Sequence, residues 1–325
     1  MNVARAAKVL VPNEWDLLRT ALFFVGIPRN AFGSIDVTGS CNLRCRHCYF
    51  FEHEQPQRSL TVREWLDLLE HWKRTRSRLE FPFLQASWVG GEPLLRKELV
   101  EKGRRYFLQN LVVTNGTIPL PDWPDVEWFV SIDGDEEVHE AIRGQKGIYA
   151  LIRRNVAAHA ALRTYVSFCI TRENAHCIER VVDDWAGMVR GFTFDFYTPL
   201  QEGEDPLWVP WVERDRILRR LSALRRARPG KFPYGDRVLR LMRSDRARDV
   251  TSHCLYAARA FSYDVSGNPK PKCVMGPKAD CSRCGCIVPF FLRALTDRRQ
   301  IARDLLPDAI GRGRAALNAL RSPTA

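Results

Sequence analysis

Two alternating hydrophobic periods between residues 33 and 200 limit the fold of this chain more than any other feature. Short apolar runs typical of buried strands alternate with longer stretches whose apolar residues recur at helical spacing. The expected strands lie at 34–37, 85–89, 111–114, 128–132, 165–170 and 192–197, and the expected helices at 61–74, 94–107, 148–162 and 174–188. Strands that alternate with helices are joined by right-handed crossovers, so the sequence predicts a parallel α/β sheet.

The number of units indicates an open barrel. A complete β/α barrel has eight units, so six form about three-quarters of it. We therefore expect a partial (β/α)6 TIM-like barrel with an open side and a small cysteine-rich, cluster-binding extension at its C-terminal end.

Thr61 and Glu64 have the spacing of a capping box at the first helix. Three prolines (Pro119, Pro121, Pro124) argue against a regular helix between the third and fourth strands.

The alternation of short apolar runs and helical patterns ends near residue 200. This change and the cysteine-rich segment predict that the chain has five parts. They are an N-terminal arm or capping helix (1–32), the barrel (33–200), a helical linker (201–250), a cysteine-rich module (251–290) and a helical tail (291–325). The linker contains an arginine-rich helix at 211–228, whose arginines we expect on a solvated face. In the module, runs at 261–265 and 269–274 around Ser266-Gly267-Asn268 predict a hairpin.

The charge of the chain is basic but does not indicate nucleic acid. Fifty Lys and Arg against 38 Asp and Glu give a net charge of +12. Many arginines lie on expected helices, where solvated faces explain them. The longest apolar run, 21–27, is far shorter than the roughly 18 residues of a membrane span, and no secretory signal is visible. We expect a cytoplasmic protein without stable membrane insertion.

Ten cysteines narrow the chemistry further. Without a secretory signal, metal or redox chemistry is a better interpretation of them than disulfides. One group lies near the start of the barrel, and a second group lies between residues 254 and 286. Cys169 and Cys177 stand alone, and we expect them to be small buried hydrophobic residues.

The first group is Cys41, Cys45 and Cys48, directly after the first expected strand. Three thiolates at this spacing can hold three irons of a [4Fe–4S] cube and leave the fourth iron open for a substrate or cofactor. The alternative is a zinc knuckle with His47 as its fourth ligand, although zinc motifs seldom use this spacing.

This CxxxCxxC motif, followed by Tyr49, resembles that of the radical S-adenosylmethionine (radical SAM) superfamily. Three further motifs stand at successive strand ends: Gly90-Gly91-Glu92-Pro93, Thr114-Asn115-Gly116, and Ser131-Ile132-Asp133-Gly134 with His139 and Arg143. Each alone also fits an ordinary turn or the start of a helix. Their order behind the cysteine motif carries the resemblance, which covers residues 33–200.

The resemblance implies a SAM site and a mechanism. The SAM-binding residues would be Tyr49, Gly90, Gly91, Glu92, Pro93, Asn115, Ser131, Asp133 and Arg143, beside a [4Fe–4S] cluster on the three cysteines. The Gly-Gly backbone would receive the amine of SAM, and Arg143 would face its carboxylate, which suits a guanidinium fork. Reductive cleavage of SAM would yield methionine and a 5′-deoxyadenosyl radical, with a flavodoxin or ferredoxin as the reducing partner.

The second group resembles the Twitch module, a shortened SPASM domain that holds one auxiliary [4Fe–4S] cluster. Its ligands would be Cys254, Cys273, Cys281 and Cys284. Cys286 departs from the pattern and is an alternative ligand. A structural zinc site also fits these residues. The cluster would assist electron transfer.

The resemblance leaves the substrate open. Our first hypothesis is hydrogen abstraction from, or radical addition to, a small metabolite in natural-product biosynthesis, as an oxidoreductase or lyase. The alternatives are a peptide maturase and a hopanoid-type lipid enzyme. Only 32 residues precede the barrel, fewer than the roughly 80 of a leader-peptide-binding module. Asp195 and Tyr197 share one face of the sixth strand, so we expect them to contact the substrate.

Overall fold

A computed structural model describes residues 29–52, 56, 58–75 and 84–296. By their internal contacts, residues 29–290 form one compact unit, and residues 1–28 with 291–325 form a second unit. The predicted N-terminal arm therefore lies almost wholly outside the described residues, and so does the predicted tail beyond residue 296.

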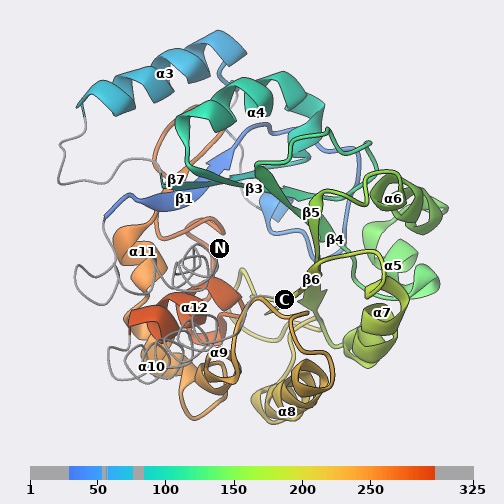
Figure 1. The fold of residues 1–325 in the computed structure, drawn as a ribbon. Coiled ribbons are helices and arrows are strands. Elements are labelled where there is room, and N and C mark those ends of the chain that lie inside the picture. The colour runs from blue at the N-terminus through green and yellow to red at the C-terminus, as the bar shows by residue number, and fades with distance from the viewer. Residues whose placement is uncertain (1–28, 53–55, 57, 76–83, 297–325) are drawn as a thin grey trace, which may run out of the picture. The chain divides into compact units, whose positions relative to one another are not determined.

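A seven-stranded sheet organises this unit (Figure 1). Its strands run in the order β6-β5-β4-β3-β2-β1-β7, and every neighbouring pair is parallel. They are β1 (Phe32–Asp36), β2 (Gln85–Val89), β3 (Gln109–Thr114), β4 (Val126–Ser131), β5 (Arg163–Ile170), β6 (Gly191–Phe196) and β7 (Phe261–Tyr263). The predicted parallel α/β architecture with six consecutive barrel strands is confirmed.

The seventh strand differs from the sequence prediction. We expected residues 261–265 to form one arm of a hairpin only, but β7 also pairs with β1 in parallel, with Gly33 opposite Phe261. The turn remains, because Asp264 N donates to Asn268 O at 2.9 Å and Tyr263 forms a single antiparallel bridge to Pro269. Lys270 N also donates to Ser262 O at 2.7 Å, so the predicted hairpin is present as a short antiparallel pairing.

The helices follow the predicted alternation. Between the strands lie α3 (Val62–Thr75), α4 (Lys97–Gly103), α5 (Glu136–Arg143), α6 (Ile148–Ala157) and α7 (Ile178–Trp185). Beyond β6 lie α8 (Trp211–Ala227), α9 (Asp236–Leu241), α10 (Ala247–Ser252), α11 (Leu255–Arg259) and α12 (Ile287–Thr296). No helix in the described parts of the chain has both the length and the apolar character needed to cross a membrane.

Local signals account for several boundaries. The predicted capping box begins α3, since Thr61 N donates to Glu64 Oε2 at 2.8 Å and Glu64 N donates to Thr61 Oγ1 at 3.2 Å. The helix expected at 94–107 is shorter, because 3-10 turns at Pro93–Arg96 and Arg104–Tyr106 flank α4. As expected, residues 115–125 contain no helix.

The two faces of the sheet differ in burial. In β4, Trp128 and Val130 are buried, whereas Phe129 and Ser131 are partly exposed. A Cβ placed on Gly116 would touch both Val130 and Ile152 of α6, so the buried face is the one that packs against the helices. The same alternation occurs in β3 and β5. The opposite face of the sheet is therefore partly open to solvent.

The edge of β6 that pairs with no other strand is hydrogen-bonded to two segments that lie far away in the sequence. Phe192 N donates to Lys231 O at 2.8 Å, and Phe196 N donates to Gly285 O at 2.9 Å. A Cβ on Gly285 would lie 1.9 Å from Phe196 O, so only glycine permits this approach. The predicted open side of the barrel is thus partly covered, and the cysteine-rich segment is held against β6.

Candidate functional site

The first three cysteines lie on a loop that leaves β1 and runs along the end of β2. Gly91 N donates to Thr38 O at 2.9 Å, and Glu92 N donates to Ser40 O at 2.9 Å. A Cβ on Gly91 would lie 2.0 Å from Ser40 O, and one on Gly90, whose φ is +121°, would lie 2.7 Å from Thr38 O. The two glycines are therefore required by the path of the cysteine loop, in addition to any approach of a ligand.

Two thiols of this loop, those of Cys41 and Cys45, accept hydrogen bonds from three N–H groups. Cys41 Sγ accepts from Leu43 N at 3.5 Å and from Asn115 Nδ2 at 3.9 Å. Cys45 Sγ accepts from Arg143 Nη1 at 3.6 Å. Burial raises the pKa of both thiols, while these donors favour the thiolate form. Soft sulfur ligands with N–H donors directed at them fit an iron–sulfur cluster, whose irons would hold the thiolate form.

The buried carboxylate of Glu92 joins the ends of β2 and β3. It accepts hydrogen bonds from Thr114 Oγ1 at 2.8 Å, from Asn115 N at 2.8 Å and from Leu94 N at 3.0 Å. Burial raises its pKa, and these three donors oppose that rise. Pro93 begins the following 3-10 turn. Glu92 therefore holds Asn115 in place.

Asn115 in turn positions the cysteine loop. Its Nδ2 donates to Asn42 Oδ1 at 2.9 Å, one residue beyond Cys41. Its Oδ1 accepts from Thr117 N at 3.0 Å. The amide thus links the end of β3 to the loop after β1, beside a predicted cluster ligand.

A buried ion pair stands behind Cys45. Nε and Nη2 of Arg143 both lie 2.6 Å from Asp133 Oδ2. Burial alone would raise the pKa of Asp133, but the charges of Arg143, His47 and His139 outweigh it, so this pKa is lowered. His139 Nδ1 accepts from Asp133 N at 3.1 Å. The Arg143 fork that we predicted for the SAM carboxylate is engaged with Asp133 in this structure.

The remaining predicted SAM residues border this region. Ser131 ends β4 opposite Ser167 and is partly exposed. Tyr49 is half-buried, and its ring lies 5.9 Å from Lys270 Nζ. Their contacts with SAM stay predictions.

His47, the fourth ligand of the zinc alternative, faces a carboxylate. Its Nε2 lies 3.5 Å from Asp133 Oδ2. Among the described residues, no three Cys, His, Asp or Glu side chains are grouped so that they could hold a single metal ion. That finding concerns single ions, whereas a cube distributes its protein ligands over separate irons.

The second cysteine group gathers beside β6. Burial raises the pKa of Cys273, and the charges of Cys281 and Cys254 raise it further. Burial likewise raises the pKa of Cys284 to about 12, with contributions from Cys273 and Cys254. The four predicted ligands therefore act on one another electrostatically, as neighbouring thiols do.

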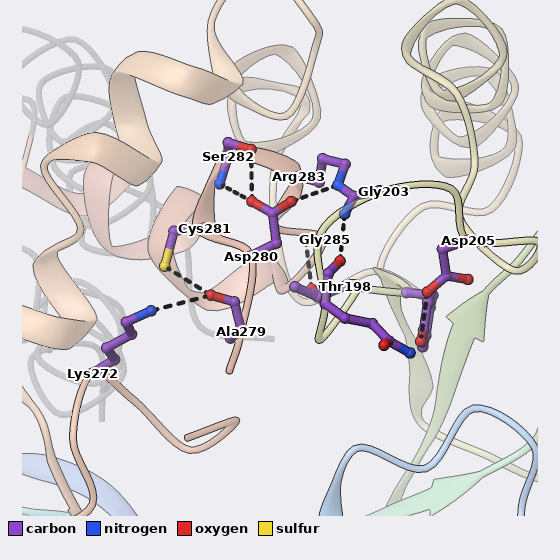
Figure 2. A network of polar contacts seen from close by, with 12 residues as sticks. Thr198, Gly203, Asp205, Lys272, Ala279, Asp280, Cys281, Ser282, Arg283 and Gly285 are labelled. Carbon is purple, nitrogen blue, oxygen red and sulfur yellow. Dashed lines mark hydrogen bonds and ion pairs between the residues drawn. The ribbon is translucent and has the colours of Figure 1, made fainter. Parts of the chain in front are cut away.

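Figure 2 shows how the segment around Cys281 is held. Asp280 caps the turn Cys281–Arg283 by accepting from Ser282 N at 2.9 Å. Arg283 reaches across to Gly203 O at 2.8 Å, and Gly285 N donates to Thr198 Oγ1 at 2.8 Å. These contacts join the segment to the chain that follows β6.

Cys286 belongs to the same group, since in addition to burial the charges of Cys284 and Cys273 help to raise its pKa, but it also faces a carboxylate. It hydrogen-bonds to the carboxylate of Asp195, whose Oδ1 also accepts from Ile287 N at 2.7 Å. Burial raises the pKa of Asp195 to about 6. Tyr197 Oη donates to Asp205 Oδ2 at 3.1 Å. The roles of Asp195 and Tyr197 toward a substrate stay predictions.

The two lone cysteines differ. Cys177 is buried as expected, but Cys169 is only half-buried, so that expectation was wrong for Cys169. It lies opposite Asp195 in the register of β5 and β6, on the face turned away from the helices. Strand alternation is the cause, and it places a thiol on the open face of the sheet.

One buried ion pair on this face was not expected from the sequence. Lys270 Nζ lies 2.7 Å from Asp36 Oδ2 and donates to Val274 O at 2.6 Å. Asp36 Oδ1 has no hydrogen-bond partner among the described residues. The position of Asp36 at the carboxyl end of the first strand was the available signal.

Comparison with known proteins agrees with this geometry. Residues 35–184 match the family model of the Radical SAM superfamily. A serine-type anaerobic sulfatase-maturating enzyme of Bacteroides thetaiotaomicron is 28% identical over 126 residues, which are 33% of this chain and 30% of that protein. An AdoMet-dependent heme synthase of Nitratidesulfovibrio vulgaris is 25% identical over 160 residues, which are 45% of this chain and 42% of that protein. The match thus spans less than half of the length of these relatives.

A solved structure resembles more of the chain. The structure of Streptococcus suis SuiB bound to precursor peptide SuiA superposes with a TM-score of 0.61 over 91% of this chain and 73% of that chain. The sequences are 12% identical, so the similarity is one of fold.

Proposed function

Residues 35–184 of this chain belong to the radical SAM superfamily, and from this premise we propose that the protein reductively cleaves SAM to start radical chemistry on an organic substrate. One observation carries the proposal. Gly91 and Glu92 at the end of β2 donate to Thr38 and Ser40 just before Cys41. Asn115 directs an N–H donor at the sulfur of Cys41, and Arg143 directs one at the sulfur of Cys45.

Cys41, Cys45 and Cys48 would hold a [4Fe–4S] cluster whose fourth iron has no protein ligand. When bound, this cluster supplies the electron that splits SAM into methionine and a 5′-deoxyadenosyl radical. The protein's own part is to position these groups. Glu92 keeps Asn115 and the loop in place, and Arg143 supplies positive charge beside Cys45.

The C-terminal cysteines would hold an auxiliary cluster. Two observations support this proposal. The charges of neighbouring cysteines of the group help to raise the pKa values of Cys273 and Cys284. The segment that contains Cys281 and Cys284 is also attached to β6 through Gly285. Ligation by four cysteines leaves no iron open, so this cluster would transfer electrons rather than bind the substrate.

For the substrate, a small metabolite bound on the open face of the sheet remains our first candidate. That face presents Ser131, Cys169 and Asp195 near the carboxyl ends of their strands. A peptide is the second candidate, favoured by the fold similarity over 91% of the chain to a structure solved with a precursor peptide.

Anaerobic reconstitution tests the central proposal. Iron and sulfide are counted in the wild-type protein and in a Cys41/Cys45/Cys48→Ala variant, and 5′-deoxyadenosine is measured after dithionite and SAM are added. We expect about eight irons in the wild type, about four in the variant, and 5′-deoxyadenosine from the wild type alone. Equal iron in both proteins contradicts the assignment of the first cluster.

A second assay separates the substrate classes. An extract of the source organism is divided by an ultrafiltration membrane, and each fraction is added to the reconstituted enzyme. Stimulation of 5′-deoxyadenosine formation by the filtrate alone supports a small metabolite. Stimulation by the protease-sensitive retentate alone supports a peptide or protein.

A further inference from the structure

Arg214 occupies a position that ordinary helix chemistry does not explain. We expected its side chain on a solvated face of the arginine-rich helix, but it is 1% exposed. It also lies in the first turn of α8, where the positive end of the helix dipole opposes a cation. A buried cation at such a position needs a compensating anion.

No carboxylate of the described residues forms an ion pair with Arg214. Arg214 Nη1 donates to Cys284 O at 2.8 Å, and the guanidinium carbon lies 4.7 Å from the ring centroid of Phe196 and 4.8 Å from that of Trp211. Nε and Nη2 are buried and have no hydrogen-bond partner within the part of the chain that the structure describes. The carboxylate of the adjacent Asp215 accepts from Ser244 Oγ at 2.6 Å.

Nε and Nη2 of Arg214 therefore have no partner among the described residues, and Nη1 of the same guanidinium is bonded to Cys284. A negatively charged group bound at Cys284 would satisfy this cation. Four thiolates outweigh the positive charge of a [4Fe–4S] core, so a cluster bound there is anionic and becomes more so on reduction. Such a group would provide the ion-pair partner that the described residues do not give Arg214. The orphaned donors thus fit the auxiliary cluster of the proposed function.

We propose that Arg214 is the charge partner of the auxiliary cluster at Cys284 and raises its reduction potential. The inference rests on the proposed auxiliary cluster, and it deepens that proposal by naming the residue that tunes it. Positive charge stabilises the reduced, more negative state over the oxidised state. The aromatic rings around the guanidinium exclude water and leave this interaction poorly screened.

The same geometry distinguishes the two neighbouring cysteines. Cys284 has the cation of Arg214 beside it, whereas Cys286 is hydrogen-bonded to the carboxylate of Asp195. A carboxylate repels the anionic cluster and a guanidinium attracts it. The assignment therefore makes Cys284 the fourth ligand and leaves Cys286 outside the cluster.

The test is a redox titration of the full chain in the Cys41/Cys45/Cys48→Ala background, which retains only the C-terminal site. Arg214→Met, Arg214→Lys and Arg219→Met are compared by electron paramagnetic resonance. Arg219 is exposed on the same helix, so its variant controls for the loss of one charge. For Arg214→Met we expect the ratio of oxidised to reduced cluster at a fixed potential to rise at least tenfold, about 59 mV for one electron. Arg214→Lys and Arg219→Met should stay near the background protein.

Each outcome decides the inference. An unchanged potential in Arg214→Met, or an equal shift in Arg219→Met, overturns it. If Arg214→Met loses its iron, Arg214→Lys decides: retention of the cluster supports the charge role, and loss shows that a positive charge at this position is not sufficient and overturns the inference. If the background protein binds no iron, the auxiliary cluster itself is refuted. Formation of 5′-deoxyadenosine by Arg214→Met with its first three cysteines intact tests the main function separately.

Discussion

Single residues decide the path of the cysteine loop. Gly91 and Ser40 approach so closely that no side chain fits between them, and Glu92 and Asn115 hold the loop from the other side. The positions of the three thiols depend on these neighbours as much as on their own spacing.

Gly91→Ala should abolish loading of the first cluster, because its Cβ would lie 2.0 Å from Ser40 O and displace the backbone next to Cys41. We expect about four irons per chain to be lost and 5′-deoxyadenosine formation to fall at least a hundredfold. Gly39→Ala, in the same loop, should keep its iron, because the added Cβ would have no heavy atom of the described residues within 4 Å apart from those of its chain neighbours. Equal iron in both variants contradicts this reading.

At the scale of elements, the edge of β6 joins the barrel to the cysteine-rich segment. Phe196 pairs with Gly285, and Arg214 of α8 reaches the carbonyl of Cys284 from the other side. The orientation of α8 in turn depends on its contacts with α9.

Gly285→Ala should separate the cysteine-rich segment from β6, since its Cβ would lie 1.9 Å from Phe196 O. We expect loss of the auxiliary cluster, about four irons, with the first cluster retained. Gly187→Ala is the matched control, because its Cβ would lie within 4 Å of no described residue other than its chain neighbours. Iron analysis and electron paramagnetic resonance of both variants check this prediction, and retention of both clusters in Gly285→Ala would refute it.

Asp236 should make the packing of α9 on α8 sensitive to acid. The hydrogen bond from Arg225, opposed by burial and aided by Ser222, lowers the pKa of Asp236 to about 2. The folded state thus holds its proton less tightly than the unfolded state, so this stabilisation is present above about pH 4 and disappears as pH falls toward 2.

We expect Asp236→Asn to lower the free energy of unfolding by about 1 kcal/mol at pH 7, with the difference shrinking below pH 4. Urea unfolding across this pH range measures it, with the exposed Asp122→Asn as the control. A difference that does not change with pH would assign the effect to packing instead.

At the scale of the whole described unit, Lys270 and Asp36 join the first strand to the C-terminal module. These residues are 234 positions apart in the chain, and their charged atoms lie 2.7 Å apart with both side chains largely buried. The pair joins the end of β1 to the segment that follows β7, beside the ring of Tyr49.

Lys270→Met should lower the free energy of unfolding by about 3–5 kcal/mol at pH 8, because it leaves the Asp36 carboxylate buried without a counter-charge. The Asp36→Asn/Lys270→Met double variant should recover a large part of this loss. Urea unfolding of the two single variants and the double variant gives the coupling energy. Additive effects would show that the pair contributes nothing specific.

Patterns between near neighbours were enough to predict much of this molecule. The alternation of strand and helix periods located six strands, and Thr61 with Glu64 located the start of α3. The order of Cys41-x3-Cys45-x2-Cys48 and Gly90-Gly91 at strand ends indicated the superfamily that the family model then matched. These signals are local, because periodicity, capping and turn chemistry depend on residues a few positions apart.

Contacts between distant residues decided the rest. Three contacts join segments that are far apart in the chain: the pairing of β7 with β1, the docking of Gly285 on β6 and the Lys270–Asp36 pair. No local sequence pattern indicates that these segments meet. Arg214 reads as one of several arginines on a helix until the fold encloses it with Phe196, Trp211 and Cys284. Burial is a property of the packed molecule, and so the charge at the second cysteine group became visible only in three dimensions.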